Sequence, residues 1–344
     1  MKAALLNAPG RISVQDIELP DVGPNEILVQ NRVALTCGTD VKLYKRGHPL
    51  AKLPLVIGHE FAGVVSKLGK GVNTFKEGDR VVAVNSAPCN ECYFCLRGQQ
   101  NLCENLGKVI GFSVPGAYAE YVSIPDRIVE KNTLRIPENV SFEEAAILEP
   151  LACAVHGSEL SAIQPGESVA IIGSGPIGLM HLQLAKNAGA SPIMISNRTA
   201  DRLQFAKHLG ADLMIISSQE DQVQRVLEFT EGRGADVVIE AVGSNDTWEK
   251  ALQMARKGGR VLMFGGCAPG TSVPLDTYRM HYEELTVKGA FHHTPASVRK
   301  AMDLITSRAI NAKAIITHKM KLEQITEALE LMAGGKALKV SLSP

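Results

Sequence analysis

One stretch, Val169–Gly178, limits the possible folds of this chain more than any other. It is a short apolar run that ends in three glycines, Gly173, Gly175 and Gly178. Such a run is typical of a buried parallel strand, and glycines at this spacing allow a tight turn, close approach to a pyrophosphate and close packing of the next helix. Helical periodicity follows, so the helix start, with Pro176 and Ile177, is expected to face the phosphates. The stretch predicts a dinucleotide-binding turn.

After about Ser141 the chain alternates between strand and helix patterns. The expected strands are Val169–Gly173, Pro192–Ser196, Leu213–Ile216, Asp236–Glu240, Arg260–Phe264 and Leu285–Lys288. Helices with apolar residues at three- and four-residue spacing are expected at Asp201–Leu209, Asp221–Thr230 and Trp248–Lys257. Repeated strand–helix units predict a doubly wound parallel sheet with right-handed crossovers, and so an α/β fold.

The first part of the chain has a different pattern. Short alternating runs such as Glu26–Val33 and Arg80–Val84 are separated by Gly, Pro, Asn and Asp, which predicts an irregular antiparallel β domain with little helix. Towards the end, two helices are expected near Val298–Thr306 and Leu322–Met332, and a strand near Ala337–Leu342. We expect residues 1–152 to form this domain, residues 289–344 to fold back onto it, and residues 153–288 to form a Rossmann domain.

The length and charge of the chain limit the kinds of partner that it can have. The 344 residues are enough for two hydrophobic cores, and 36 Lys and Arg balance 36 Asp and Glu, so no net charge attracts nucleic acid or an anionic membrane. The N-terminal apolar run is too short for a signal peptide, and no later run approaches a membrane span. We therefore expect a cytoplasmic protein with a small-molecule substrate, a setting in which clustered thiols bind metal more often than they form disulfides.

Four cysteines lie close together in the sequence. Their spacing lets four sulfurs converge on one ion, and four thiolates suit a zinc site that has no open position and is therefore structural. The alternatives are two disulfides and an iron–sulfur cluster. The expected reducing compartment disfavours disulfides, and no other sequence feature indicates an electron-transfer centre. The residues are Cys89, Cys92, Cys95 and Cys103.

A second set of metal-competent residues is scattered through apolar surroundings: Cys37, His59, Glu60 and Glu149. One thiolate, one imidazole and one carboxylate suit a catalytic zinc that keeps a position for water or substrate. From spacing alone, a histidine after a strand is also consistent with an ordinary hydrogen-bonded residue, and that alternative stays open.

These motifs together resemble the medium-chain dehydrogenase/reductase family. The string from Gly58 to Gly63, continuing to Val72, is similar to the family's zinc signature. Cys37–Asp40, the four-cysteine loop and Gly173–Gly178 occur in the family's order and separation. Glu149–His156 most resembles the sorbitol-type polyol dehydrogenases and their threonine dehydrogenase relatives. The resemblance implies a GroES-like catalytic domain beside the Rossmann domain, and a homotetramer or homodimer.

The resemblance also implies two zinc ions per chain, one catalytic and one structural. Cys37, His59 and a carboxylate would hold the catalytic ion. In sorbitol-type members that carboxylate corresponds to Glu60, whereas Glu149 matches a second glutamate that coordinates directly or through water. Which of the two binds is left open.

The implied reaction is hydride transfer between a secondary alcohol, a polyol or sugar alcohol, and a nicotinamide cofactor. Thr39 matches the hydroxyl that relays the substrate proton, but Lys42 stands where many relatives carry the next histidine, which leaves the last relay step open. Threonine-type or simple secondary alcohols are alternative substrates. The intact ligand set argues against a zinc-free enone or quinone reductase and against a binding protein without turnover.

The residues after the second Rossmann strand bear on the choice of cofactor. NAD-preferring turns carry an acidic residue there, but here Ser196 leads to Asn197. Arg198 and Arg202 follow, and guanidinium groups bind a ribose 2′-phosphate with charge-assisted hydrogen bonds. The pattern favours NADP over NAD. In the alternative interpretation both arginines are solvated and Asn197 hydrogen-bonds an unphosphorylated ribose.

Overall fold

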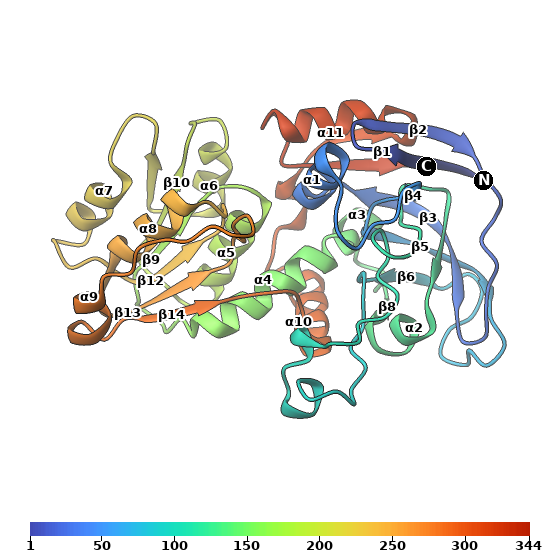
Figure 1. Ribbon diagram of the computed structural model, residues 1–344, viewed down its shortest axis with the longest axis horizontal. Helices are drawn as coiled ribbons and strands as arrows, with labels where there is room; N and C mark the ends of the chain where they lie inside the picture. Colours follow the sequence, from blue (N-terminus) through green and yellow to red (C-terminus); the bar gives the residue numbers. More distant parts are fainter. The chain divides into compact units, whose positions relative to one another are not determined.

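The computed structural model describes residues 1–344, which form two compact units. The β unit comprises Met1–Ala152 and His293–Pro344, and the Rossmann unit comprises Cys153–His292. Both chain termini lie in the β unit (Figure 1). None of the helices combines the length and the apolar character that crossing a membrane requires.

The Rossmann unit contains a six-stranded sheet in the order β11-β10-β9-β12-β13-β14, with every neighbouring pair parallel. The predicted doubly wound sheet is therefore confirmed, and the strand order reverses direction between β9 and β12, where such sheets bind ligands. The strands are β9 (Val169–Ile172), β10 (Ile193–Asn197), β11 (Leu213–Ile216), β12 (Ala235–Glu240), β13 (Ala255–Met263) and β14 (Thr286–Gly289).

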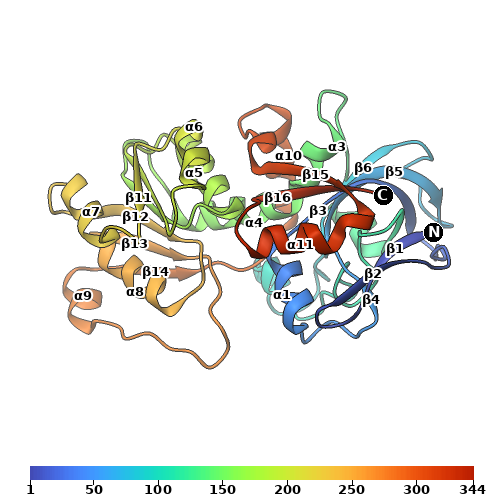
Figure 2. The same ribbon diagram turned by 90° about the horizontal axis from the view of Figure 1, so that it is seen from above.

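Helices cover both faces of this sheet. Helices α5 (Pro176–Asn187) and α6 (Leu203–Leu209) lie on one face, and α8 (Asn245–Met254) lies on the other (Figure 2). Helix α7 (Gln222–Phe229) packs against α8. The short helix α9 (Thr277–Tyr282) precedes β14 and was not predicted.

One predicted helix is displaced. The sequence pattern placed it at Trp248–Lys257, but α8 runs over Asn245–Met254 and the next three residues begin β13. Ser244 caps the helix by accepting a hydrogen bond from the amide of Thr247, and Ala255 already pairs with Ala235 of β12. The cap and the strand pairing together move the helix three residues towards the N-terminus.

The β unit is built on two sheets. The larger has the order β15-β16-β3-β5-β6-β8, with β7 also paired to β3, and the smaller has the order β2-β1-β4. All strand pairs except β15–β16 are antiparallel. The strands are β1 (Lys2–Ala8), β2 (Arg11–Asp16), β3 (Ile27–Leu35), β4 (Leu55–Val56), β5 (Glu60–Leu68), β6 (Arg80–Ala83), β7 (Tyr121–Ile124), β8 (Thr133–Arg135), β15 (Ile316–Lys321) and β16 (Lys339–Ser343).

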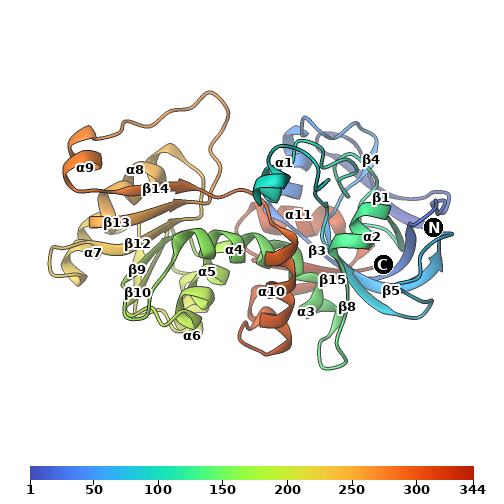
Figure 3. The ribbon, with the colours of Figure 1, turned by 90° about the horizontal axis from the view of Figure 1, so that it is seen from below.

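The β unit has more helix than the sequence pattern predicted. Helix α10 lies beside α3 (Figure 3), and α11 packs against α1. Helix α4 begins in this unit with Glu149 in its first turn, followed by a proline, which fits the start of a helix. The helices are α1 (Gly38–Arg46), α2 (Asp126–Asn132), α3 (Phe142–Ala146), α4 (Leu148–Ser161), α10 (Pro295–Thr306) and α11 (Ile325–Ala333).

The last strand of the chain is an interior strand of the large sheet. β16 lies between β15 and β3, with Ser341 opposite Leu35 and Leu342 opposite Ala34. This register brings Lys339 next to the residues that follow β3. The C-terminal segment therefore helps to build the candidate site described next.

Candidate functional site

Three of the predicted zinc ligands come together in the β unit. The ligating atoms of Cys37, His59 and Glu60, here called the Cys37 cluster, all lie within 4.8 Å of one another. Cys37 follows the end of β3, and Glu60 begins β5 directly opposite Leu35. His59 and Glu60 are 3% and 0% exposed. A partly exposed thiol with a buried imidazole and a buried carboxylate at this separation has the donor chemistry of a zinc site.

The start of α1 explains the position of Cys37. Its Sγ accepts a hydrogen bond from the amide of Thr39 (3.4 Å), and Asp40 Oδ2 accepts one from the amide of Cys37 (2.9 Å). These reciprocal bonds form a capping box in which cysteine takes the place usual for serine. The sulfur therefore lies at a helix N-terminus, where the backbone dipoles favour negative charge.

Asp40 also orients His59. Its Oδ1 lies 3.1 Å from Nδ1 of His59, so Nδ1 carries the proton and Nε2 is the nitrogen with a lone pair for a metal. Burial lowers the pKa of His59, but the negative charges of Asp40 and Cys37 outweigh burial and raise it well above its usual value. A zinc ion would supply the positive charge that this environment favours.

Glu60 is paired with a buried lysine that sequence reasoning missed. Lys339 Nζ lies 2.6 Å from Oε1, also contacts Oε2, and donates to the carbonyl of Thr36 (3.1 Å). Burial raises the pKa of Glu60 to about 7, whereas Glu60 outweighs burial and raises the pKa of Lys339. Contact of the ammonium with both oxygens favours the ionised pair, because an isolated charge in this setting is costly.

Glu149 belongs to a different group of side chains. It is buried in the first turn of α4, and its carboxylate lies within 4.8 Å of a ring nitrogen of His293. His293 is itself buried, with Nε2 3.2 Å from Oδ1 of Asn85. The structure thus groups Glu60, and not Glu149, with Cys37 and His59. Neither Asn85 nor His293 was a predicted site residue.

Aromatic rings line one side of the Cys37 cluster. The ring of Phe112 lies 5.2 Å from that of His59 and 5.1 Å from that of His48, measured between centroids. Thr39 is partly exposed in the first turn of α1, and Lys42 is exposed one turn later. Burial lowers the pKa of His48, so its neutral form is favoured. The imidazole of His48 therefore contacts the same aromatic ring as that of His59.

The four-cysteine loop has the geometry of a tetrathiolate site. The Sγ–Sγ separations are 3.5 Å for Cys89–Cys103, 3.9 Å for Cys89–Cys95 and 4.0 Å for Cys92–Cys103. A tetrahedral ion with Zn–S bonds of about 2.3 Å has sulfur–sulfur edges of about 3.8 Å. All four cysteines are free thiols in the structure. Backbone amides also approach the sulfurs at 3.3 Å: those of Cys89, Cys92 and Asn105.

Two of the three glycines of the Rossmann turn, Gly173 and Gly178, occupy positions that exclude a side chain. Gly173 has φ +101°, and a Cβ there would lie 2.7 Å from the side chain of Val242. A Cβ on Gly178 would overlap the carbonyl oxygen of Gly173, so only glycine lets α5 pack on β9. Gly175 caps α5, with Pro176 at the first helical position, and Arg202 Nη1 lies 3.9 Å from where its Cβ would be. A guanidinium therefore faces the turn.

A cavity of about 570 Å³ lies at the carboxyl ends of β9, β10 and β11. Its lining includes four of the predicted cofactor residues: Gly173, Ser196, Asn197 and Arg198. The lining also includes Lys250, which pairs with Asp246 at 2.8 Å. Residues that sequence reasoning missed also line it: Ser217, Ser218, Gln222, Ser244 and Thr247.

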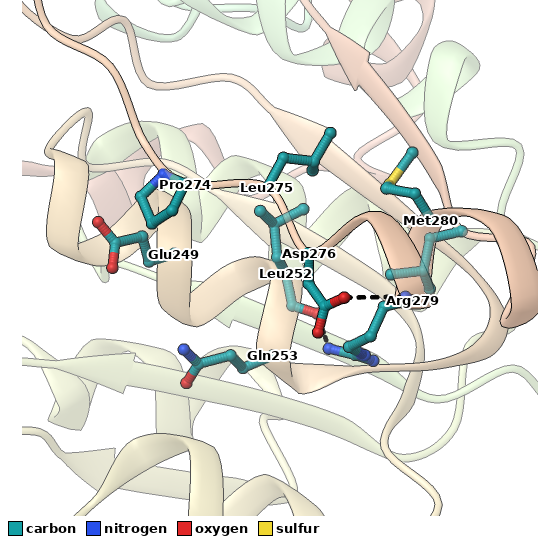
Figure 4. A pocket seen from close by; sticks show the side chains of 9 residues that line it. Glu249, Leu252, Gln253, Pro274, Leu275, Asp276, Arg279 and Met280 are labelled. Atoms are coloured by element: carbon teal, nitrogen blue, oxygen red, sulfur yellow. Dashed lines mark hydrogen bonds between the residues drawn. The ribbon is translucent and has the colours of Figure 1, made fainter.

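A second cavity of the Rossmann unit, about 320 Å³, contains none of the predicted residues (Figure 4). It lies between α8 and the segment leading into α9. Its one arginine, Arg279, is committed to Glu283 (2.7 Å) and to the carbonyls of Leu252 (2.7 Å) and Ala255 (2.8 Å). This cavity therefore offers no cation to a phosphate.

Comparison with known proteins agrees with this geometry. The family profile described as alcohol dehydrogenase GroES-like domain matches residues 23–137, and that described as zinc-binding dehydrogenase matches residues 176–307. The chain is similar to an L-threonine 3-dehydrogenase of Symbiobacterium thermophilum, with 37% identity over 98% of this chain and 96% of that protein. It is 30% identical to a sorbitol dehydrogenase of Bacillus subtilis, over 100% of this chain and 97% of the relative.

A solved structure gives the same result. The chain is similar to a protein from Sinorhizobium meliloti 1021 that was crystallised with bound NADP, with a TM-score of 0.93 and 34% identity over 100% of this chain and 99% of that one. The two family profiles match in sequence order, and full-length relatives include polyol and threonine dehydrogenases. The chain therefore belongs to the zinc-dependent medium-chain dehydrogenase/reductase family and is an alcohol oxidoreductase.

Proposed function

We propose that this enzyme interconverts a polyol or sugar alcohol with its ketose, oxidising a secondary alcohol with NADP as the hydride acceptor. One observation carries the proposal: a thiol, an imidazole and a carboxylate meet within 4.8 Å in the Cys37 cluster. Zinc bound there would supply Lewis-acid polarisation of the alcohol, and the nicotinamide would take the hydride. The four-cysteine loop would hold a second, structural zinc ion.

The chain's own residues have separate tasks in this scheme. Cys37, His59 and Glu60 would hold the catalytic zinc, while Asp40 keeps Nε2 of His59 available for it. The hydroxyl of Thr39 would receive the substrate proton. Because Thr39 is partly exposed in the first turn of α1, the proton would then leave to solvent. Glu149 would act as a second carboxylate beside the substrate.

The cofactor proposal rests on the charges at the ribose end of the large cavity. Asn197 replaces the carboxylate that would repel a 2′-phosphate, and Arg198 lines the same space. The one carboxylate in the lining, that of Asp246, is paired with Lys250. The phosphates would lie against the Gly173–Gly178 turn, with Ile177 and Arg202 at its helix side.

A threonine-type activity is the second candidate. An L-threonine 3-dehydrogenase is 37% identical to this chain over nearly its whole length, more than the sorbitol dehydrogenase. The buried Glu149 would then face the substrate's ammonium group, because a carboxylate attracts a cation in a dry setting.

Steady-state assays of polyols, sugar alcohols, L-threonine and simple secondary alcohols with NADP and NAD test both candidates. The proposal expects the highest kcat/KM with a polyol and NADP. A higher kcat/KM for threonine would select the second candidate, and activity confined to simple alcohols would exclude both. Metal analysis in the same preparation is expected to find two zinc ions per chain.

A charge-reversed cofactor site tests the NADP assignment. Arg198→Glu is expected to lower kcat/KM for NADP by about 10- to 100-fold and to leave that for NAD within about threefold, since only the 2′-phosphate is lost as a partner. Arg233→Glu, at an exposed position outside the cavity, is the matched control. An equal loss for both cofactors would refute the assignment. We further propose a cytoplasmic homodimer or homotetramer, which light scattering after size exclusion would test.

A further inference from the structure

Tyr118 is a buried residue with a contact that the proposed function does not yet use. It is 0% exposed and is the largest fully buried side chain of the molecule. Its hydroxyl donates to Oδ2 of Asp40 at 2.6 Å, and its ring lies against the backbone of Gly58. A Cβ on Gly58 would lie 2.6 Å from the ring, and φ is +94° there. Only glycine therefore fits at the position before His59 while the ring of Tyr118 is in place.

Asp40 connects Tyr118 with two members of the Cys37 cluster. One oxygen, Oδ2, accepts from the hydroxyl of Tyr118 and from the amide of Cys37 (2.9 Å), while the other, Oδ1, faces Nδ1 of His59 at 3.1 Å. The carboxylate is fully buried, so no water replaces a lost donor at low cost. Its orientation decides which nitrogen of the imidazole points towards the metal.

We propose that Tyr118 is a positioning residue that locks the carboxylate of Asp40, and through it the imidazole of His59, and so sets how tightly the Cys37 cluster retains zinc. This inference rests on the zinc site of the proposed function. The last torsion of an aspartate is soft, so a carboxylate held by one donor at Oδ2 rotates more freely than one held by two. Such rotation lengthens the bond to Nδ1 and weakens the ligand.

The burial of the phenol strengthens the argument. Burial raises the pKa of Tyr118 well above its usual value, and the carboxylate of Asp40 raises it further. The hydroxyl therefore stays protonated and donates throughout the working pH range. It has no second acceptor at comparable distance, since the carbonyl of Leu35 is 3.4 Å away.

The test compares the purified zinc enzyme with Tyr118→Phe, which keeps the ring and its packing on Gly58. Zinc transfer to a chromophoric chelator should resolve two ions per chain. We expect one of them to dissociate about tenfold faster in the variant, within the range seen for outer partners of metal ligands, and the other to be unchanged. Tyr121→Phe removes a hydroxyl three residues away, outside this network, and should alter neither.

Two further readouts separate positioning from general stability. Cobalt substituted at the catalytic site should show shifted visible absorption bands in Tyr118→Phe but not in Tyr121→Phe. In an Asp40→Asn background, adding Tyr118→Phe should change zinc release less than twofold, because the route through Asp40 is already broken.

The outcomes are distinct. A wild-type protein with a single zinc ion would overturn the proposed catalytic site itself. Two ions in the wild type with unchanged zinc release and cobalt bands in Tyr118→Phe would overturn the role of Tyr118 alone, even if the melting temperature fell. Additive effects of the Tyr118 and Asp40 variants would also overturn it, since the two side chains would then act independently.

Discussion

The Cys37 cluster and the four-cysteine loop suit the same metal but are built in opposite ways. All four sulfurs of the loop come from one short segment, Cys89–Cys103, and backbone amides of that segment and of Asn105 donate to them. The Cys37 cluster takes its residues from a helix cap and a strand start, and its support from Tyr118 and Lys339 far along the chain. The four-cysteine loop, the closed site, is therefore held by one short segment, whereas the Cys37 cluster, the open site, is held by residues far apart in the sequence of the β unit.

The largest expected effect comes from removing the thiolate of the open site. Cys37→Ser is expected to lower kcat/KM by at least about 10³-fold, because the ligand set that polarises the alcohol is lost. Cofactor binding, followed by fluorescence of the reduced nicotinamide, should stay within about threefold of wild type. Zinc content should fall from two ions to one. Retained turnover would remove Cys37 from the active site.

Breaking the distant support of the open site comes next. Lys339→Met leaves the buried carboxylate of Glu60 without its cation, and about 3–5 kcal/mol of unfolding free energy should be lost. Urea unfolding of the protein stripped of zinc by a chelator measures this, because a zinc ion at the Cys37 cluster would itself pair with Glu60. The double variant with Glu60→Gln should recover most of the loss, since no buried charge is left unpaired. A single-variant effect below about 1 kcal/mol would show that the ion pair is not maintained.

The closed site should respond differently. Cys103→Ser is expected to weaken zinc binding in the loop by at least about 100-fold, or about 3 kcal/mol, because one of four ligands is lost. Zinc content should fall to one ion, with a lower melting temperature but near-normal kcat per folded molecule. If kcat fell as far as in Cys37→Ser, the two sites would not be independent.

A buried histidine of the Rossmann unit sharpens the contrast with His59. His181 is 0% exposed, neither ring nitrogen has a hydrogen-bond partner, and its ring meets that of Phe264 at 4.9 Å. Burial lowers its pKa to about 3. The unfolded state therefore binds the proton first, and stability is lost as pH falls below about 6.5.

The size of this pH effect follows from the two pKa values. His181 should make the protein about 2 kcal/mol less stable at pH 5 than at pH 8. His181→Leu should abolish that share of the pH dependence in urea unfolding, whereas His208→Leu, at an exposed position on α6, should not. An unchanged pH profile in His181→Leu would mean that the imidazole is protonated in the folded state.

The same contrast explains what the sequence could predict. The Rossmann sheet and the four-cysteine loop follow from local patterns. In the Rossmann turn, Gly173 and Gly178 each have a steric reason to be glycine. The Cys37 cluster needed a family resemblance, since no spacing rule connects Cys37 with His59. The role of Lys339 could not be predicted from the sequence, because only the sheet order places β16 beside β3. Helix α8 was displaced because strand pairing, not periodicity, decides where it ends.

The position of Lys339 has a consequence for biosynthesis. It is separated from Glu60 by 279 residues, and β16 must enter between β15 and β3 before the two meet. A ribosome completes the whole Rossmann unit before it makes that strand, so during translation the nucleotide-binding half can fold while the metal-binding half still lacks an interior strand. Zinc binding at the proposed Cys37 site would then follow the synthesis of β16.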